Sequence, residues 1–256
     1  MRVNLQPSYI LHSRPYRDSS SLLEVFTAEY GRLSLVARGG RRSSRGGSKA
    51  ALLQPFTPLL LSFSGRAEMK NLGAVESAGA AISLQGERLF SGLYINELLS
   101  RLLHRHDPHP RLFAAYGAAL ESLLACARIE DVLRRFEYTL LDELGYSFDL
   151  ACDAVSGEPV EVGQWYQYHP GLGLVRCQGV AEPSRSAYAG DELLLMADGD
   201  FGDGVRSSAK RLLRQALAEH IGDTPLRSRE LFRSYSRETV AARQRPGGNA
   251  DEGGES

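Results

Sequence analysis

The spacing of apolar residues changes abruptly near residue 80, and this change restricts the fold more than any other feature of the sequence. Up to that point the chain carries short apolar runs, such as 22–27 and 33–37, separated by turn-forming residues. Beyond it, apolar residues recur at every third or fourth position, as in 87–106. Alternation with a period near two predicts strands, whereas a period near 3.6 predicts helices. The sequence therefore predicts an α+β protein in which a β part is followed by an α part.

The first part of the chain predicts a small β-barrel. Five strand-like runs separated by turn signals fall before residue 80, at 9–13, 22–27, 33–37, 59–63 and 67–72. Five short strands are typical of an OB-fold, whose face and loops commonly hold nucleic acid. An SH3-like barrel would give much the same pattern, so the strand count leaves both barrels open.

The rest of the chain predicts a helical bundle and a small β-rich insertion. Helical periodicity marks 87–106, 112–124, 132–144, 205–221 and 226–235, and Gly145 follows the third of these as a C′ glycine would. Residues 151–203 are instead rich in glycine, proline and aromatic side chains. We therefore expect an OB-fold nucleic-acid-binding domain over 1–80, a helical domain over 81–150 and 204–240, the insertion over 151–203, and a disordered tail over 246–256.

The composition excludes several classes of protein. With 43% hydrophobic and 24% charged residues, the 256-residue chain is typical of globular proteins. No apolar run approaches the roughly 18 residues of a membrane span, and no secretory signal follows residues 1–4. Three cysteines are too few for a disulfide scaffold. We therefore expect a cytoplasmic protein.

Charge is strongly segregated, although the net charge of the chain is only −1. Residues 1–80 carry a net charge of +6, residues 81–200 of −9, and residues 201–245 of +5. Separate basic and acidic surfaces indicate distinct partners, although the same charges would also serve to keep three modules soluble.

The most basic segment is 38–49, which holds five basic and no acidic residues between two predicted strands. Glycines let the backbone approach a phosphate chain, and arginine and lysine attract it whatever its sequence. A solvated surface loop is the alternative interpretation. The segment lacks the spacing of a P-loop, which argues against an ATPase. The expected phosphate contacts are Arg38, Arg41, Arg42, Arg45 and Lys49, with secondary contacts from Arg14, Arg17, Arg66, Lys70, Lys210, Arg211 and Arg214.

Two aromatic residues at polar positions, Tyr9 and Tyr16, are candidates for stacking on unpaired bases. Most aromatic residues in a barrel of this size belong to its core, which is the competing interpretation for both.

The sequence offers no convincing catalytic or metal site. Three histidines lie beside two prolines and Asp107 at a predicted helix end: His104, His106 and His109. A solvated helix terminus explains them better than a metal site does. Cys152 and Cys177 have no partner at CxxC spacing, and structural zinc needs four ligands. No nucleophile motif is present. We therefore expect no enzyme activity, no metal and no cofactor.

Six segments stand out in order along the chain: 11–15 (LHSRP), 54–61 (QPFTPLLL), 91–99 (SGLYINELL), 134–137 (RRFE), 144–146 (LGY) and 228–232 (SRELF). Together they resemble the RecO family of bacterial recombination mediators, over residues 8–235. The resemblance implies an N-terminal OB-fold, a helical domain, and a zinc-finger-like insertion that is metal-free in some members. This chain lacks the four-cysteine pattern of the zinc-bearing members.

The resemblance also implies a function. Members of the family help to load RecA onto DNA coated with single-stranded-DNA-binding protein, and they work with RecR and sometimes RecF. They bind single- and double-stranded DNA and anneal complementary strands, so we expect the protein at the nucleoid. The basic residues above then become predicted DNA contacts, and charge neutralisation explains annealing without ATP.

A second expected site receives the acidic C-terminal tail of single-stranded-DNA-binding protein. Such a site needs an apolar groove with an arginine at its rim. We expect Arg134, Arg135 and Phe136 to form it, the alternative being that one arginine only bridges to Asp131 or Glu137. Two other functions stay open: an RNA-binding, translation-associated OB protein, and a protein-binding adaptor without affinity for polyanions.

Overall fold

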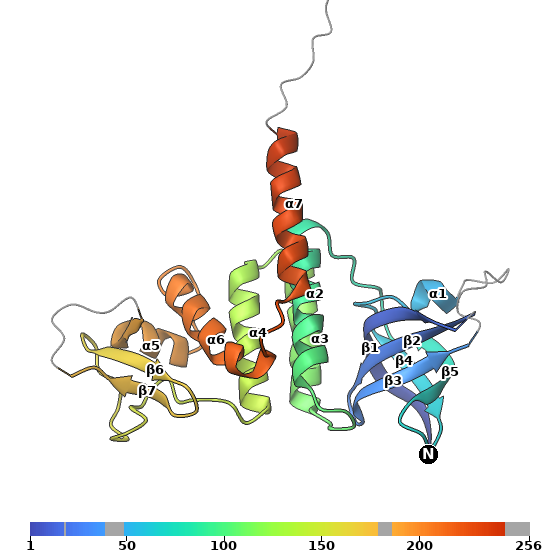
Figure 1. Ribbon diagram of the computed structural model, residues 1–256, viewed down its shortest axis with the longest axis horizontal. Helices are drawn as coiled ribbons and strands as arrows, with labels where there is room; N and C mark the ends of the chain where they lie inside the picture. Colours follow the sequence, from blue (N-terminus) through green and yellow to red (C-terminus); the bar gives the residue numbers. More distant parts are fainter. Residues whose placement is uncertain (18, 39–48, 179–185, 244–256) are drawn as a thin grey trace, which may run out of the picture.

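The alternating N-terminal segments close into a five-stranded barrel in the computed structural model, which describes residues 1–17, 19–38, 49–178 and 186–243 (Figure 1). The strands are β1 (Arg2–Tyr16), β2 (Ser20–Thr27), β3 (Gly31–Ala37), β4 (Leu59–Ser64) and β5 (Lys70–Ser77). Their order around the barrel is β1-β2-β3-β5-β4, with β3 and β5 parallel and the other neighbours antiparallel. The predicted OB-like barrel is confirmed.

The barrel has a core of its own, which explains the period of two in its sequence. One face of each strand points inward, and the buried residues there include Ile10, Leu23, Leu35, Leu61 and Phe63. Strand β1 is longer than the sequence predicted because its two halves pair with different strands, the first with β4 and the second with β2. The short helix α1 (Lys49–Leu52) precedes β4.

The connection that follows helix α2 (Gly86–Leu102) lies beside β3, at the part of β3 that does not pair with β5. These strands pair only at Leu35 and Val36 of β3. Further along β3, Arg32 forms a parallel bridge with Arg105, and its carbonyl accepts a hydrogen bond from His106 N at 3.0 Å. Gly31 has a φ of 65°, and a Cβ at this position would overlap the backbone oxygen of Asp107. The barrel is therefore fixed to the helical part through its own backbone.

Aromatic side chains fill the interface between the barrel and the helices. Tyr9 and Phe26 of the barrel pack against Phe113 and Tyr116, with ring centroids 4.9–6.4 Å apart. Tyr9, expected to be a candidate for base stacking, lies instead in this interface. Tyr16 is half-buried, and the guanidinium of Arg17 lies 5.2 Å from its ring centroid.

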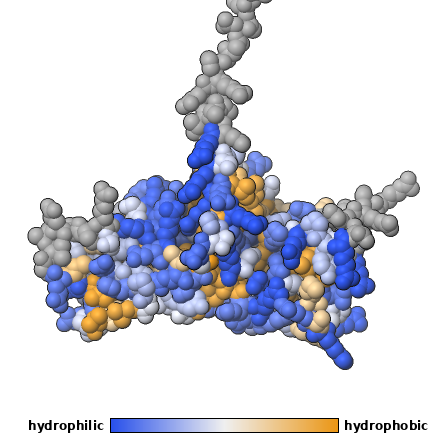
Figure 2. All heavy atoms as spheres, in the orientation of Figure 1, coloured by the Kyte–Doolittle hydropathy of each residue, from blue (hydrophilic) through white to orange (hydrophobic). Residues whose placement is uncertain are grey.

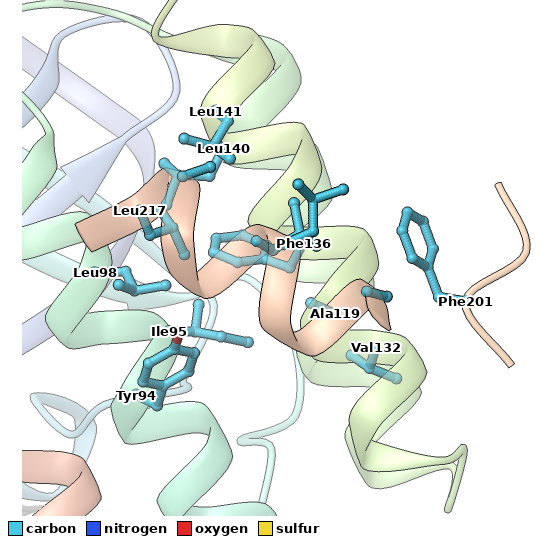
Figure 3. Close-up of a cluster of buried hydrophobic side chains, with 14 of the residues drawn as sticks. Tyr94, Ile95, Leu98, Ala119, Val132, Phe136, Leu140, Leu141, Phe201 and Leu217 are labelled. Carbon is cyan, nitrogen blue, oxygen red and sulfur yellow. The ribbon is translucent and has the colours of Figure 1, made fainter. Parts of the chain in front are cut away.

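The helical part is a bundle that buries one continuous core. Its helices are α2 (Gly86–Leu102), α3 (Pro110–Leu124), α4 (Ile129–Glu143), α6 (Arg206–Ile221) and α7 (Arg227–Arg243). Figure 3 shows Phe136 of α4 and Leu217 of α6 pointing into this core together with Ile95 and Leu98 of α2. Helix α4 ends as predicted, since Gly145 has a φ of 74° and its N–H donates to the carbonyl of Asp142.

Residues 150–203 contain a three-stranded sheet beside α6, at the end of the molecule opposite the barrel (Figure 1). The strands β6 (Trp165–His169), β7 (Gly173–Arg176) and β8 (Ala187–Ala189) lie in the order β7-β6-β8, and α5 (Gly190–Ala197) follows. The sequence did not predict α5, because eight residues are too few to display a helical period. The whole molecule is thus a row of barrel, bundle and small sheet, with α7 projecting from the bundle (Figure 1).

The carboxylate of Asp153 joins two segments of the small sheet region. It accepts hydrogen bonds from the backbone N–H groups of Val155, Ser156 and Arg176, at 2.9, 2.7 and 2.5 Å. These bonds lower its pKa to about 2.

In the described ranges, no three His, Cys, Asp or Glu side chains lie where they would hold a metal ion. No described helix is long and apolar enough to cross a membrane.

Candidate functional site

Exposed arginines follow a row of paired residues that winds around the barrel, and the strand register places them there. Arg14 pairs with Leu22, and Leu22 pairs with Val36 on the next strand. Val36 pairs in turn with Asn71, whose Oδ1 accepts a hydrogen bond from Arg38 Nη2 at 3.4 Å. Arginines that are far apart in the sequence therefore belong to one row of paired residues around the barrel.

Three more exposed arginines lie near the two ends of this row. Arg17 lies in the connection between β1 and β2, and Arg66 lies in the connection between β4 and β5. Arg2 pairs with Ser64, immediately before that second connection. We call these exposed residues the arginine rim: Arg2, Arg14, Arg17, Arg38 and Arg66. Because β1 and β4 are antiparallel, Arg2 and Arg66 lie toward the opposite end of the strands from Arg14 and Arg17. The sequence did not predict Arg2, because it belongs to the part of β1 that was not predicted as strand.

The rim differs from the predicted DNA-binding set in several ways. Arg41, Arg42 and Arg45 lie outside the described residues, and the side chain of Lys49 is not described. Lys70 is buried, with Nζ donating to the carbonyl of Ala67 at 2.7 Å, so it does not belong to the exposed rim. Glu68 lies close to Arg66 in sequence but is ion-paired with Arg105. The exposed arginines therefore add positive charge along the row of paired residues.

A second basic site is a pocket of about 330 Å³ among four helices of the bundle. Its apolar surface comes mainly from aromatic and branched residues of α2, α4 and α7: Phe90, Tyr94, Ile129, Leu133 and Phe232. Its cations come from α4, α6 and α7: Arg134, Arg206, Lys210, Arg214, Arg229 and Arg233. Figure 2 shows a hydrophobic patch beside the lower part of α7, surrounded by hydrophilic surface. We call this site the basic pocket.

The cations of the basic pocket lie close enough to affect one another. Burial lowers the pKa of Lys210, and the charges of Arg214 and Arg134 lower it further. Burial and the charges of Arg229 and Arg134 likewise lower the pKa of Arg214. Two carboxylates, Glu87 and Glu130, also line the pocket, and Glu137 and Asp203 pair with Arg134 and Arg206, so six cations face four acidic side chains. The excess of positive charge favours an anionic ligand.

Arg134 forms the floor of the basic pocket together with a buried ion pair. Its Nη2 donates to Glu137 Oε1 at 2.8 Å, and Tyr94 Oη donates to the same oxygen at 2.7 Å. Glu137 is fully buried and Arg134 is only 5% exposed. Burial raises the pKa of Glu137, whereas the charge of Arg134 opposes that shift. The sequence left open that one of the two arginines bridges to Glu137, and Arg134 is the arginine that does so.

The remaining predicted tail-binding residues lie elsewhere on α4. Phe136 is buried in the bundle core, where Figure 3 shows it pointing inward (3% exposed). Arg135 is exposed and lines a shallow groove beside α3 rather than the basic pocket. The structure therefore separates the three consecutive residues, because neighbours on a helix point about 100° apart.

The three predicted basic residues of α6 are also divided between two surfaces. Lys210 and Arg214 line the basic pocket. Arg211 faces the small sheet, where Nη2 donates to the carbonyl of Ala187 at 2.6 Å and the guanidinium lies 4.4 Å from the Tyr188 ring centroid. Sequence reasoning missed Arg229, Phe232 and Arg233, although the basic character of the last helix was visible.

Comparison with known proteins gives consistent matches over nearly the whole chain. The family model for the N terminus of recombination protein O matches residues 1–81, and the model for its C terminus matches residues 83–230. DNA repair protein RecO of Pseudomonas aeruginosa strain PAO1 is 48% identical over 89% of this chain and 94% of its own length. RecO of Methylococcus capsulatus is 45% identical over 92% of this chain and 95% of its own, and RecO of Nitrosococcus oceani is 46% identical over 93% and 96%.

Proposed function

Because the chain belongs to the RecO family of DNA repair and recombination proteins, we propose that it acts as a recombination mediator. In this role it binds single- and double-stranded DNA, anneals complementary strands, and helps to load RecA onto DNA coated with single-stranded-DNA-binding protein. It works by binding rather than by catalysis, at the DNA of the nucleoid.

The observation that carries the proposal is the arginine rim. Five exposed guanidinium groups follow one row of paired residues around an OB-like barrel, from parts of the chain as far apart as Arg2 and Arg66. Arginine pairs with phosphate through its planar fork of donors. Contacts of this kind bind a sugar–phosphate chain without regard to sequence. The basic segment 38–49 leaves the barrel beside Arg38, so its residues Arg41, Arg42, Arg45 and Lys49 extend the same interface in this proposal.

Annealing follows from the same chemistry. Two complementary strands repel each other through their phosphates, and bound arginines reduce this repulsion by neutralising phosphate charges. No nucleotide hydrolysis is required for this step. The rim therefore supports a protein that accelerates strand pairing through charge neutralisation alone.

The basic pocket supports the second part of the proposal, which is recruitment by single-stranded-DNA-binding protein. The acidic tail of that protein ends in an aromatic side chain and a free carboxylate. Leu133 and Phe232 provide apolar surface, while Arg134, Lys210 and Arg214 provide positive charge within the same pocket. We assign the tail to this pocket. Of the three residues predicted to bind the tail, Arg134 remains in this assignment, and other pocket residues take the place of Arg135 and Phe136. Lys210 and Arg214 move from the predicted DNA contacts to this site.

The two sites lie on different parts of the molecule, which supports simultaneous binding of DNA and its coat protein. The rim belongs to the barrel at one end of the row, and the pocket belongs to the helices at its centre (Figure 1). RecR, RecF and RecA are further partners in the proposal, on the basis of the family.

The proposal is tested by measuring DNA affinity against salt. A variant with Arg14, Arg17, Arg38 and Arg66 changed to Gln keeps the barrel core and removes four rim charges. We expect weaker binding to every DNA sequence and a shallower salt dependence, by about 0.7–0.9 in slope for each phosphate that is no longer neutralised. Unchanged affinity and slope would contradict the DNA interface. Preference for structured RNA over single-stranded DNA in competition would favour a translation-associated protein instead.

A further inference from the structure

Beneath the basic pocket, three side chains from two helices meet at one carboxylate oxygen. Tyr94 comes from α2, and Arg134 and Glu137 come from α4, one turn apart. Both Tyr94 Oη and Arg134 Nη2 donate to Glu137 Oε1. Glu137 does not line the pocket, whereas Arg134 and Tyr94 do.

The ion pair leaves several polar atoms without hydrogen bonds. Arg134 Nε and Nη1, together with Glu137 Oε2, have no partner within the part of the chain that the structure describes. Buried polar atoms are nearly always paired in folded proteins, and exceptions need a reason. Since Arg134 lines the pocket, an anionic ligand there is a partner for its unpaired N–H groups.

The surroundings of Arg134 would otherwise push its guanidinium away. Lys210, Arg214 and Arg229 reach the same region from α6 and α7, and each acts on its neighbours as a like charge. The guanidinium of Arg229 also lies 5.5 Å from the Tyr94 ring centroid. Glu137 is the buried carboxylate that faces these cations, and its hydrogen bond holds one nitrogen of Arg134 in place.

We propose that Glu137 is the positioning residue of the basic pocket: by fixing Arg134 through Nη2, it presents the remaining N–H groups of that arginine to a carboxylate on the ligand. Tyr94 fixes Glu137 in turn. The inference rests on the proposed function, in which the pocket binds an acidic peptide tail. In this role the buried carboxylate of Glu137 strengthens the binding of an anion, although its negative charge by itself would weaken that binding.

This opposition provides the test. The probe is a fluorescent acidic peptide that ends in an aromatic residue, made with a free carboxylate and with a terminal amide, and anisotropy gives its affinity for the full-length protein. Glu137→Gln removes the charge and keeps the side-chain shape. We expect it to bind the free-carboxylate peptide at least about fivefold more weakly and to lose most of the preference for carboxylate over amide.

The matched control is Glu130→Gln, which removes an exposed carboxylate from the same pocket without a hydrogen bond to Arg134. We expect this variant to bind the peptide slightly more tightly, because only repulsion is removed. The inference is overturned if Glu137→Gln binds the peptide as tightly as the wild type or more tightly. It is also overturned if this variant keeps its preference for the free carboxylate.

Two further variants separate this inference from the proposed function. In an Arg134→Ala background, Glu137→Gln should have no additional effect on peptide affinity, since the double-mutant cycle measures their shared action. If Arg134→Ala binds like the wild type, the pocket assignment fails and the inference fails with it. If Arg134→Ala loses binding and Glu137→Gln does not, only the inference fails. Should Glu137→Gln not fold, Tyr94→Phe decides, with a loss of about threefold and a reduced carboxylate preference expected.

Discussion

The carboxylate of Glu97 on α2 holds the first residues of α7 through Ser228, accepting hydrogen bonds from Ser228 N at 2.9 Å and from Ser228 Oγ at 2.8 Å. Arg227 N donates to the other oxygen of Glu97 at 3.0 Å. A carboxylate from another helix thus takes the place of an N-cap residue and binds the free N–H groups at the start of α7. Because α7 forms one wall of the basic pocket, Glu97 determines where that wall lies.

Changing Glu97 to Gln should loosen α7. Charge-assisted hydrogen bonds of this kind contribute about 1.5–3 kcal/mol. Burial alone would raise the pKa of Glu97, but hydrogen bonds from Ser228 and Arg227 and the charge of Arg101 lower it. These groups therefore favour the ionised carboxylate. Hydrogen exchange should show faster exchange at amides 227–233, with little change in the barrel strands. Glu76→Gln, on the exposed face of the barrel, is the control, and equal exchange in both variants would refute this role.

Replacing Gly31 with Ala should destabilise the junction between the barrel and the helices. The alanine would be forced into a left-handed conformation and its Cβ would overlap the backbone of Asp107. Gly157→Ala is the matched control, because Gly157 has a φ of 73° with no atom within 4 Å of its Cβ position. We expect Gly157→Ala to lose about 1–2 kcal/mol of unfolding free energy from the backbone conformation alone.

Gly31→Ala should lose clearly more than Gly157→Ala, and the excess measures the overlap with Asp107. Chemical denaturation followed by circular dichroism gives both values. Equal losses for the two variants would mean that the connection after α2 moves freely away from β3, contrary to the backbone bridge between Arg32 and Arg105.

Asp153 should make the small sheet region sensitive to acid. Hydrogen bonds from Ser156, Arg176 and Val155 lower its pKa to about 2, from an ordinary value of 3.8. The stability that it contributes is therefore complete above pH 3.8 and is lost as the pH falls to about 2. Unfolding free energies of the wild type and Asp153→Asn should differ at neutral pH and converge toward pH 2. A gap that stays constant over this range would show that the carboxylate charge plays no part, and Glu158→Gln, in the same loop, should follow the wild type throughout.

Much of the fold was predictable because local patterns determine it. The barrel strands alternate since one face of each lines a core, and α4 stops at Gly145 because the chain there adopts a left-handed turn. By contrast, α5 spans only eight residues, and the first half of β1 carries no clear alternation. These elements form through contacts with distant parts of the chain, which a local window does not contain.

The candidate sites were less predictable for the same reason. Arg134 and Arg135 are adjacent in the sequence but face different surfaces, and the i, i+3 spacing of Arg134 and Glu137 was the one local sign of their ion pair. The basic pocket combines residues of four helices, including Phe90 and Phe232. The rim depends on strand register, which brings Arg2 beside the connection that holds Arg66.

We propose that separate surfaces of the protein bind DNA and its coat protein, and strand annealing on bare and precoated DNA tests this most directly. With complementary strands precoated with single-stranded-DNA-binding protein, we expect the wild type to accelerate annealing and Arg134→Ala to lose most of this acceleration. On bare strands, Arg134→Ala should anneal like the wild type. The Arg14, Arg17, Arg38 and Arg66 to Gln variant should be slow on both. Equal defects of the two variants on bare DNA, or normal annealing by the rim variant, would contradict the account.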